Sequence, residues 1–159
     1  MDDILKILKE NARESLETMA TMLNKSVDDI KEAISAYEDD GVIKGYQAIL
    51  DEDKLEGDTV TAVIEVKVVP EREGGFDHIA NRIAQFPEVV SMYLMSGDSD
   101  LMLFVQGDNI RNVASFVSEK LSTIPGITGT STHFTLKTYK YRGVIMGEQD
   151  ERERLKVSP

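Results

Sequence analysis

The chain has 159 residues, no cysteine, and 29 Asp plus Glu against 18 Lys plus Arg, for a formal net charge of -11. The lack of cysteine excludes disulfides, thiolate zinc sites and a cysteine nucleophile, and the net charge opposes contact with phosphate except where cations gather locally. Because no apolar run is long enough to cross a bilayer, and the first ten residues do not resemble a signal peptide, we expect a cytoplasmic protein with no membrane partner.

The first 50 residues are expected to form three helices followed by a strand. Apolar residues recur at helical spacing in three groups, which are Ile4, Leu5 and Leu8; Leu16, Met19, Ala20 and Leu23; and Ile30, Ala33, Ile34 and Tyr37. Ser26 is the expected N-cap of the third helix, Asp28 and Asp29 suit its first turn, and Gly41 ends it. The pattern therefore predicts two short helices joined by a tight turn. Residues 42–50 are rich in β-branched and aromatic side chains and predict a strand.

An acidic segment follows, and we place the domain boundary there. Residues 51–58 contain five carboxylates and a glycine, which predicts a solvated linker between a domain of residues 1–50 and a domain of residues 59–139. In the second domain, strands are expected over residues 60–68, 89–95, 101–105 and 127–138, and helices over residues 75–86 and 110–121.

The order β-α-β-β-α-β predicts an α+β fold of the ferredoxin-like type, in which two helices cover one face of a four-stranded antiparallel sheet. The other face would be exposed in a monomer, so we expect a homodimer that packs sheet on sheet. Residues 140–159 form a charged tail that includes the segment EQDERERLK, and we expect a solvated helix or disorder there.

Several motifs together resemble the Lrp/AsnC family of bacterial and archaeal transcription regulators. In the first domain they are Met22-Leu23-Asn24, Ser26, Ile30, Ile34 and the run Glu38-Asp39-Asp40-Gly41-Val42-Ile43-Lys44-Gly45-Tyr46. In the second domain they are Pro87-Glu88-Val89-Val90, Gly97-Asp98-Ser99-Asp100-Leu101, and Ile124-Pro125-Gly126-Ile127 followed by Thr130 and Thr132. Each motif is weak alone, whereas their shared order and spacing form a specific pattern that covers nearly everything before the tail.

The resemblance implies a helix-turn-helix domain that binds double-stranded DNA, and a second domain that binds an amino acid or related metabolite between subunits of a homodimer or higher oligomer. The residues we expect to contact DNA are Lys25, Ser26, Lys31, Ser35 and Lys44. The residues that the resemblance assigns to the effector are Gly97, Asp98, Ser99, Asp100, Thr130 and Thr132. A carboxylate suits the ammonium group of an amino acid, and hydroxyls suit its carboxylate. The same residues are also common in hairpin turns and strands, which leaves a purely structural interpretation open.

The expected recognition helix departs from the family pattern because it is acidic. Asp28, Asp29, Glu32 and Glu38 accompany one base, Lys31, and residues 1–50 hold six Lys plus Arg against eleven Asp plus Glu, a net charge of -5. Since phosphate contacts supply much of the affinity for DNA, two functions remain in contention. One is a metabolite-responsive transcription regulator. The other is a ligand-binding or assembly module of the same architecture whose DNA binding is weakened or lost.

We expect no enzymatic activity, no cofactor and no metal. His78 and His133 lack a second histidine at metal-ligand spacing, and the sequence has no glycine-rich nucleotide-binding loop. Siroheme decarboxylases resemble this family in fold, but their histidine and aromatic-rich segments have no counterpart in this chain.

Overall fold

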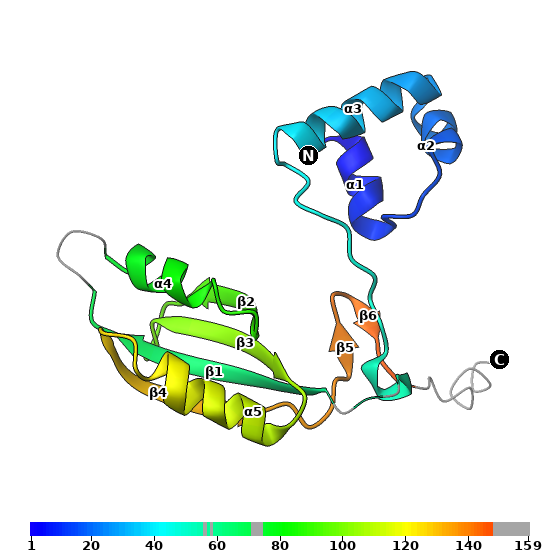
Figure 1. Ribbon diagram of the computed structural model, residues 1–159. Coiled ribbons are helices and arrows are strands. Elements are labelled where there is room, and N and C mark those ends of the chain that lie inside the picture. Colours follow the sequence, from blue (N-terminus) through cyan, green and yellow to red (C-terminus); the bar gives the residue numbers. More distant parts are fainter. Residues whose placement is uncertain (56, 58, 71–74, 148–159) are drawn as a thin grey trace, which may run out of the picture. The chain divides into compact units, whose positions relative to one another are not determined.

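The computed structural model describes residues 1–55, 57, 59–70 and 75–147. The chain forms two compact units, residues 1–50 and residues 51–159, each with its own hydrophobic core (Figure 1). No helix in the described ranges is long and apolar enough to span a membrane.

The first unit consists of three helices, α1 (Asp3–Glu10), α2 (Leu16–Leu23) and α3 (Val27–Asp39). Its core contains one nearly inaccessible residue from each helix, namely Ile4, Met19 and Ile30. Asn24 ends α2 in the left-handed conformation, with φ at 52°, which asparagine tolerates better than most residues. The chain then enters α3 within three residues, so the predicted pair of helices with a tight turn is confirmed.

The strand predicted for residues 42–50 does not form. These residues join no sheet, and Val42, Ile49 and Leu50 are exposed. The Tyr46 hydroxyl donates a hydrogen bond to Glu38 Oε1 at 2.8 Å, which ties the segment to α3. The prediction was wrong because β-branched residues favour extended backbone, whereas a strand also needs a neighbouring strand to pair with its backbone groups.

The second unit has the predicted β-α-β-β-α-β order, which confirms the α+β fold. Its elements are β1 (Val60–Val68), α4 (Asp77–Ile83), β2 (Val89–Leu94), β3 (Leu101–Gly107), α5 (Ile110–Ser115) continued by the π-helix η2 (Phe116–Leu121), and β4 (Ile127–Phe134). The strands are antiparallel in the order β2-β3-β1-β4, so β1 and β3 are central and β2 and β4 lie at the edges.

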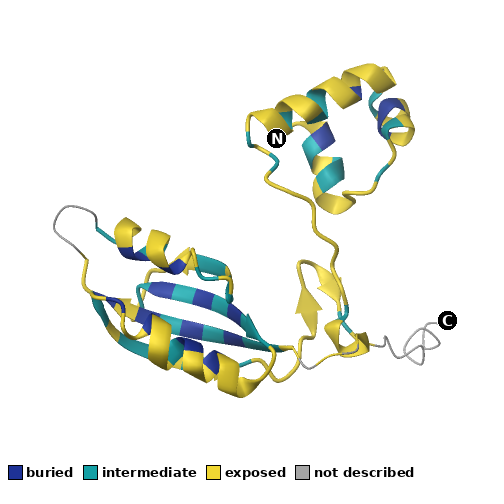
Figure 2. Cartoon of the chain, in the orientation of Figure 1, coloured by how far each residue is buried: buried dark blue, intermediate teal, exposed yellow. Residues whose placement is uncertain are grey.

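The helices lie against one side of this sheet, which we call the covered face. Alternate residues of the central strands are buried there, including Ile64 and Val66 of β1 and Leu103 of β3, and they pack with Ile83 and Phe116 from the helical layer. Figure 2 shows this alternation as bands along β1 and β3. It follows the period of two in the sequence, because successive side chains of a strand point to opposite faces.

The opposite side, which we call the open face, is not covered by any described element of the second unit. Val63, Met102 and Phe104 are half-buried on it, and Tyr93 is 52% exposed. The rings of Tyr93 and Phe104 meet edge to face, with centroids 6.0 Å apart. The open face therefore carries an apolar patch of the kind that marks a partner surface.

Three other predictions need correction. The linker is not entirely irregular, because residues Glu52–Lys54 form a 3-10 turn, η1, whose Glu52 accepts a hydrogen bond from Gln106. The last strand ends at Phe134 instead of residue 138. The start of the expected tail forms a hairpin, β5 (Lys140–Tyr141) and β6 (Val144–Ile145), in place of a helix or disorder, while the segment EQDERERLK lies outside the described residues.

Candidate functional sites

A capping box fixes the start of α3, the expected recognition helix. Ser26 Oγ accepts a hydrogen bond from the Asp29 backbone N–H at 3.0 Å, and Asp29 Oδ2 accepts one from the Ser26 N–H at 3.2 Å. Hydrogen bonding of the Asp29 carboxylate with the Ser26 side chain and with its backbone N–H lowers the pKa of Asp29. Ser26 thus has a structural role whether or not it contacts DNA, since the pair satisfies two of the free N–H groups at the start of the helix.

The other expected DNA contacts lie along α3 and at its two ends. Lys31 and Ser35 are exposed one turn apart on α3, and Lys25 is exposed in the turn before it. Lys44 follows the helix, and its ammonium group lies over Gly41, where a Cβ would come within 2.7 Å of Nζ. The structure brings Lys31 and Ser35 together on one surface and places the other two lysines at opposite ends of the helix.

Acidic residues share the outward surface of α3. Asp28, Glu32 and Asp39 are exposed at positions that flank Lys31 and Ser35 when the helix buries Ile30. The charge inferred from the sequence is therefore a property of the surface that would approach DNA.

The acidic turn of the second unit, Gly97–Asp100, joins β2 to β3 and contacts the end of β1. Asp100 N donates to Val66 O at 3.0 Å, and Asp100 Oδ2 accepts from Val68 N at 2.8 Å. Gly97 has φ at 134°, a conformation that L side chains rarely adopt, and Asp98 is exposed. Asp100 therefore already holds a structural hydrogen bond, whereas Asp98 presents its carboxylate to solvent.

The two threonines assigned to the effector lie on the other side of β1, in β4. Thr130 pairs with Val66, so β1 separates it from Asp100 by about two strand spacings, or about 10 Å. Thr132 pairs with Ile64, two residue pairs further along the sheet. Both threonines share the covered side of the sheet with their buried partners. The structure thus brings Thr130 near Asp100 and places Thr132 further away.

Ser99 belongs to the open face instead. Its hydroxyl donates to Glu65 Oε2 at 2.9 Å, and Glu65 Oε1 lies 3.7 Å from His133 Nε2, which is itself 3.2 Å from Ser131 Oγ. This polar cluster of Glu65, Ser99, Ser131 and His133 joins the turn, β1 and β4. Sequence reasoning missed it because the cluster depends on the pairing of Glu65 with Ser131, and alternation within one strand does not reveal cross-strand register.

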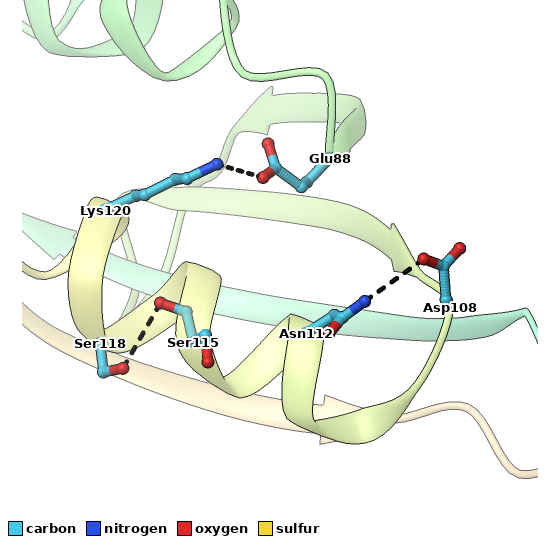
Figure 3. Close-up of polar contacts among 6 residues, drawn as sticks. All are labelled: Glu88, Asp108, Asn112, Ser115, Ser118 and Lys120. Carbon is cyan, nitrogen blue, oxygen red and sulfur yellow. Dashed lines mark hydrogen bonds and ion pairs between the residues drawn. The ribbon is translucent and has the colours of Figure 1, made fainter.

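A groove of about 430 Å³ lies at the end of the sheet away from the acidic turn, beside the start of β2 and the α5–η2 helix. Figure 3 shows its polar side chains, where Lys120 donates to Glu88 Oε1 and Asn112 Nδ2 donates to Asp108 Oδ2 at 3.3 Å. The hydrogen bond from Lys120 lowers the pKa of Glu88, although partial burial opposes the shift. Glu88 Oε2 is buried, and no hydrogen-bond partner for it occurs among the described residues. The Glu88–Lys120 pair links the loop before β2 to η2.

A helix-turn-helix unit followed in one chain by a ferredoxin-like unit is the domain composition of a two-domain transcription regulator. Comparisons with known proteins identify the family to which the chain belongs. Residues 61–145 match the family model described as the Lrp/AsnC ligand binding domain. The uncharacterized HTH-type transcriptional regulator YugG of Bacillus subtilis is 46% identical over 158 residues, covering 99% of this chain and 95% of that protein. The Bkd operon transcriptional regulator of Pseudomonas aeruginosa is 32% identical over 142 residues, covering 87% of this chain and 90% of that protein.

A solved structure agrees at the level of the fold. A transcriptional regulator from Neisseria meningitidis, crystallised as a complex with L-Met, superposes with a TM-score of 0.70 at 21% identity, covering 98% of this chain and 99% of that chain. Together with the matching family model and the two relatives, this shows that the chain belongs to the Lrp/AsnC family. It is a DNA-binding transcription regulator whose second unit is a ligand-binding domain.

Proposed function

We propose that α3 and its flanking residues contact operator DNA, and that the second unit binds an amino acid that changes this contact. The observation that carries the proposal is the presence, in one chain, of an exposed α3 started by a capping box and a domain that matches the family's ligand-binding model. Lys25, Lys31 and Lys44 supply the positive charge of this surface, and Ser26 and Ser35 supply hydroxyl groups next to it. The protein would act in the cytoplasm, where bacterial and archaeal DNA is found.

We further propose that the amino acid binds beside the Gly97–Asp100 turn. Asp98 is the carboxylate that we assign to the ammonium group because it is exposed, whereas Asp100 is half-buried and its Oδ2 accepts a hydrogen bond from Val68 N, which leaves Oδ1 as a further acceptor for the ligand. Gly97 and Ser99 offer backbone groups in the turn, and Thr130 and Thr132 offer hydroxyl groups on the covered side of β4, whereas the Ser99 hydroxyl is held on the open face by Glu65. The Neisseria regulator of the same fold was crystallised with L-Met, so L-methionine is the first ligand to test.

The functional unit would be a homodimer that covers the open face, with higher oligomers built from it. The apolar patch around Val63, Met102 and Phe104 supports a sheet-on-sheet contact between two copies. The exposed apolar residues of the segment 42–50, which finds no strand partner within one described chain, support a contact between copies as well.

One observation favours the second candidate function, a ligand-sensing module with weakened DNA binding. Asp28, Glu32 and Asp39 lie on the outward surface of α3, where they repel phosphate. The two functions differ in the affinity of the protein alone for specific DNA at physiological salt.

The test is fluorescence anisotropy with a labelled duplex from upstream of the protein's own gene and a scrambled duplex of the same length, at 50 mM and 200 mM salt, with and without L-methionine. The proposal predicts tighter binding to the upstream duplex, and a loss of this preference in Lys31→Ala. Lys9→Ala removes an exposed lysine of α1 and is the matched control, expected to bind as the unaltered protein does. Equal binding to both duplexes, or no binding at 50 mM salt, would support the ligand-sensing module instead.

The effector is tested separately by calorimetric titration of the protein with each of the common amino acids, L-methionine first. Asp98→Asn should abolish the binding of an amino acid that the unaltered protein binds, because the amide carries no charge to pair with the ammonium group. Asp108→Asn changes an acidic residue at the other end of the sheet and serves as the control. Unchanged binding to Asp98→Asn would refute the assigned site.

A further inference from the structure

The β5–β6 hairpin carries the positive charge that α3 lacks. Residues 120–147 contain no Asp or Glu, and three of their four cations, Lys137, Lys140 and Arg142, lie in or next to the hairpin. The whole chain has 29 acidic residues, so an acid-free stretch of this length is a marked departure from its composition. Among the ion pairs found within the described residues, none involves these three cations.

The backbone of the hairpin presents its tip to solvent. Lys140 pairs with Ile145 and Tyr141 pairs with Val144, which leaves a two-residue loop of Arg142 and Gly143. Both loop residues have positive φ, 45° and 90°, as a type I′ turn requires. The turn therefore fixes Arg142 at the end of a two-stranded ribbon, and all four strand residues are exposed, as the yellow hairpin in Figure 2 shows.

Aromatic rings hold two of the cations in place. Lys137 Nζ lies 5.2 Å from the centroid of the Tyr139 ring, and Arg142 Cζ lies 5.6 Å from that of Tyr141. The Arg142 Nε–H also donates to the Tyr141 hydroxyl at 3.3 Å. A ring attracts a cation without neutralising it, so these side chains are partly ordered and still carry their full charge.

We propose that the β5–β6 hairpin contacts the phosphate backbone of duplex DNA as a second binding surface; this inference rests on the proposed function. A basic two-stranded ribbon has the charge and the width to approach a groove of DNA, and Arg and Lys contacts to phosphate supply affinity without sequence preference. The hairpin thereby provides affinity, and α3 provides specificity. The acidic surface of α3 is then compatible with binding DNA.

The test compares how the affinity for DNA depends on salt in two triple variants. The first, Lys137→Gln, Lys140→Gln and Arg142→Asn, removes the hairpin charges; asparagine at position 142 suits the positive φ and preserves the turn. The matched control, Lys54→Gln, Arg82→Gln and Arg111→Gln, removes three exposed bases elsewhere in the second unit, so both variants have the same net charge. Both are measured on the upstream and scrambled duplexes from 50 mM to 200 mM salt.

Each lost phosphate contact makes the slope of log affinity against log salt less steep by about 0.9, so the hairpin variant should lose a slope of about 2.7 on both duplexes for each hairpin that contacts the duplex. Over a fourfold rise in salt, the unaltered protein should then lose about 40-fold more affinity than the hairpin variant for each hairpin in contact with the duplex. The control should keep the original slope. A charge-retaining variant, Lys137→Arg, Lys140→Arg and Arg142→Lys, should also keep it, which would show that charge rather than hairpin folding is responsible.

The opposite results are distinct from a failure of the proposed function. If the unaltered protein binds DNA and the hairpin variant shows the same slope, the inference is wrong and the proposed function stands. If the hairpin variant instead loses its oligomeric state in analytical ultracentrifugation, the hairpin contacts a second copy of the chain, and the inference is again wrong. If the unaltered protein binds neither duplex at 50 mM salt, both fail.

Discussion

Replacing Asp100 with alanine should destabilise the second unit, because this carboxylate has a structural role that is separate from any role in binding an effector. Asp100 Oδ2 accepts a hydrogen bond of 2.8 Å from the backbone N–H of Val68, a residue that is only 6% exposed. Alanine would leave that N–H buried without a partner, at a cost of about 1–3 kcal/mol in the free energy of unfolding. For a chain of this size, the midpoint of thermal unfolding should fall by about 2–12 °C.

The assay is urea unfolding followed by far-ultraviolet circular dichroism, since the chain has no tryptophan to report by fluorescence. Hydrogen exchange of the Val68 amide provides a local readout, and it should become faster in Asp100→Ala. Asp100→Asn retains an acceptor oxygen and should lose less stability, and Asp98→Asn, at an exposed position, should change the stability by less than about 0.5 kcal/mol. If Asp100→Ala is as stable as the unaltered protein and its Val68 amide exchanges at the original rate, the hydrogen bond does not stabilise the fold.

Three further substitutions test other parts of the structure. Ile30→Ala, at a fully buried position, should lower the stability of the first unit by about 2–5 kcal/mol and speed amide exchange in residues 1–50, while β1 and β3 keep their protection. Asp29→Asn should lower the midpoint of thermal unfolding at pH 7. In the folded state the pKa of Asp29 is below its ordinary value of 3.8, so the carboxylate stabilises the fold only while it is ionised. The difference in midpoint between the variant and the unaltered protein should therefore disappear as the pH falls through that lowered pKa. Gly126→Ala should lower the free energy of unfolding, measured by chemical denaturation, by about 1–3 kcal/mol. The new Cβ would lie 2.6 Å from Ile79 Cδ1, and the backbone φ of 93° is one that alanine rarely adopts. Gly129→Ala, where the Cβ would meet open space, is the control and should lower it less.

The parts of the fold that the sequence predicts are those governed by local periodicity. Alternate apolar residues identify β1 because its buried side chains face the covered side at every second position. Ser26 is recognisable as an N-cap because the hydroxyl satisfies backbone groups of its own first turn. Both signals lie within a few residues of the element they define.

The parts that it does not predict depend on partners distant in the sequence. The strand expected over residues 42–50 has the right side chains but no neighbouring strand within the described residues. The β5–β6 hairpin was missed because Arg142 occupies a positive φ that is usually taken by glycine or asparagine, so the turn has a weak signature. The cluster of Glu65 and His133 requires the register between β1 and β4, which shifts at an irregularity between Lys67 and Val68.

The distribution of charge suggests how an acidic protein can act on DNA. At physiological ionic strength, charges separated by more than about 8 Å in solvent are largely screened, so the net charge of -11 matters less than the charges next to each phosphate. On α3, Lys31 lies within a turn of Asp28 and Glu32, so this helix gains little from phosphate contacts. A carboxylate can still accept a hydrogen bond from a cytosine amino group in the major groove, which discriminates between bases without adding general affinity. In the proposed function, the acidic α3 would therefore contribute specificity more than affinity, and the proposed contact of the β5–β6 hairpin would hold the protein on DNA.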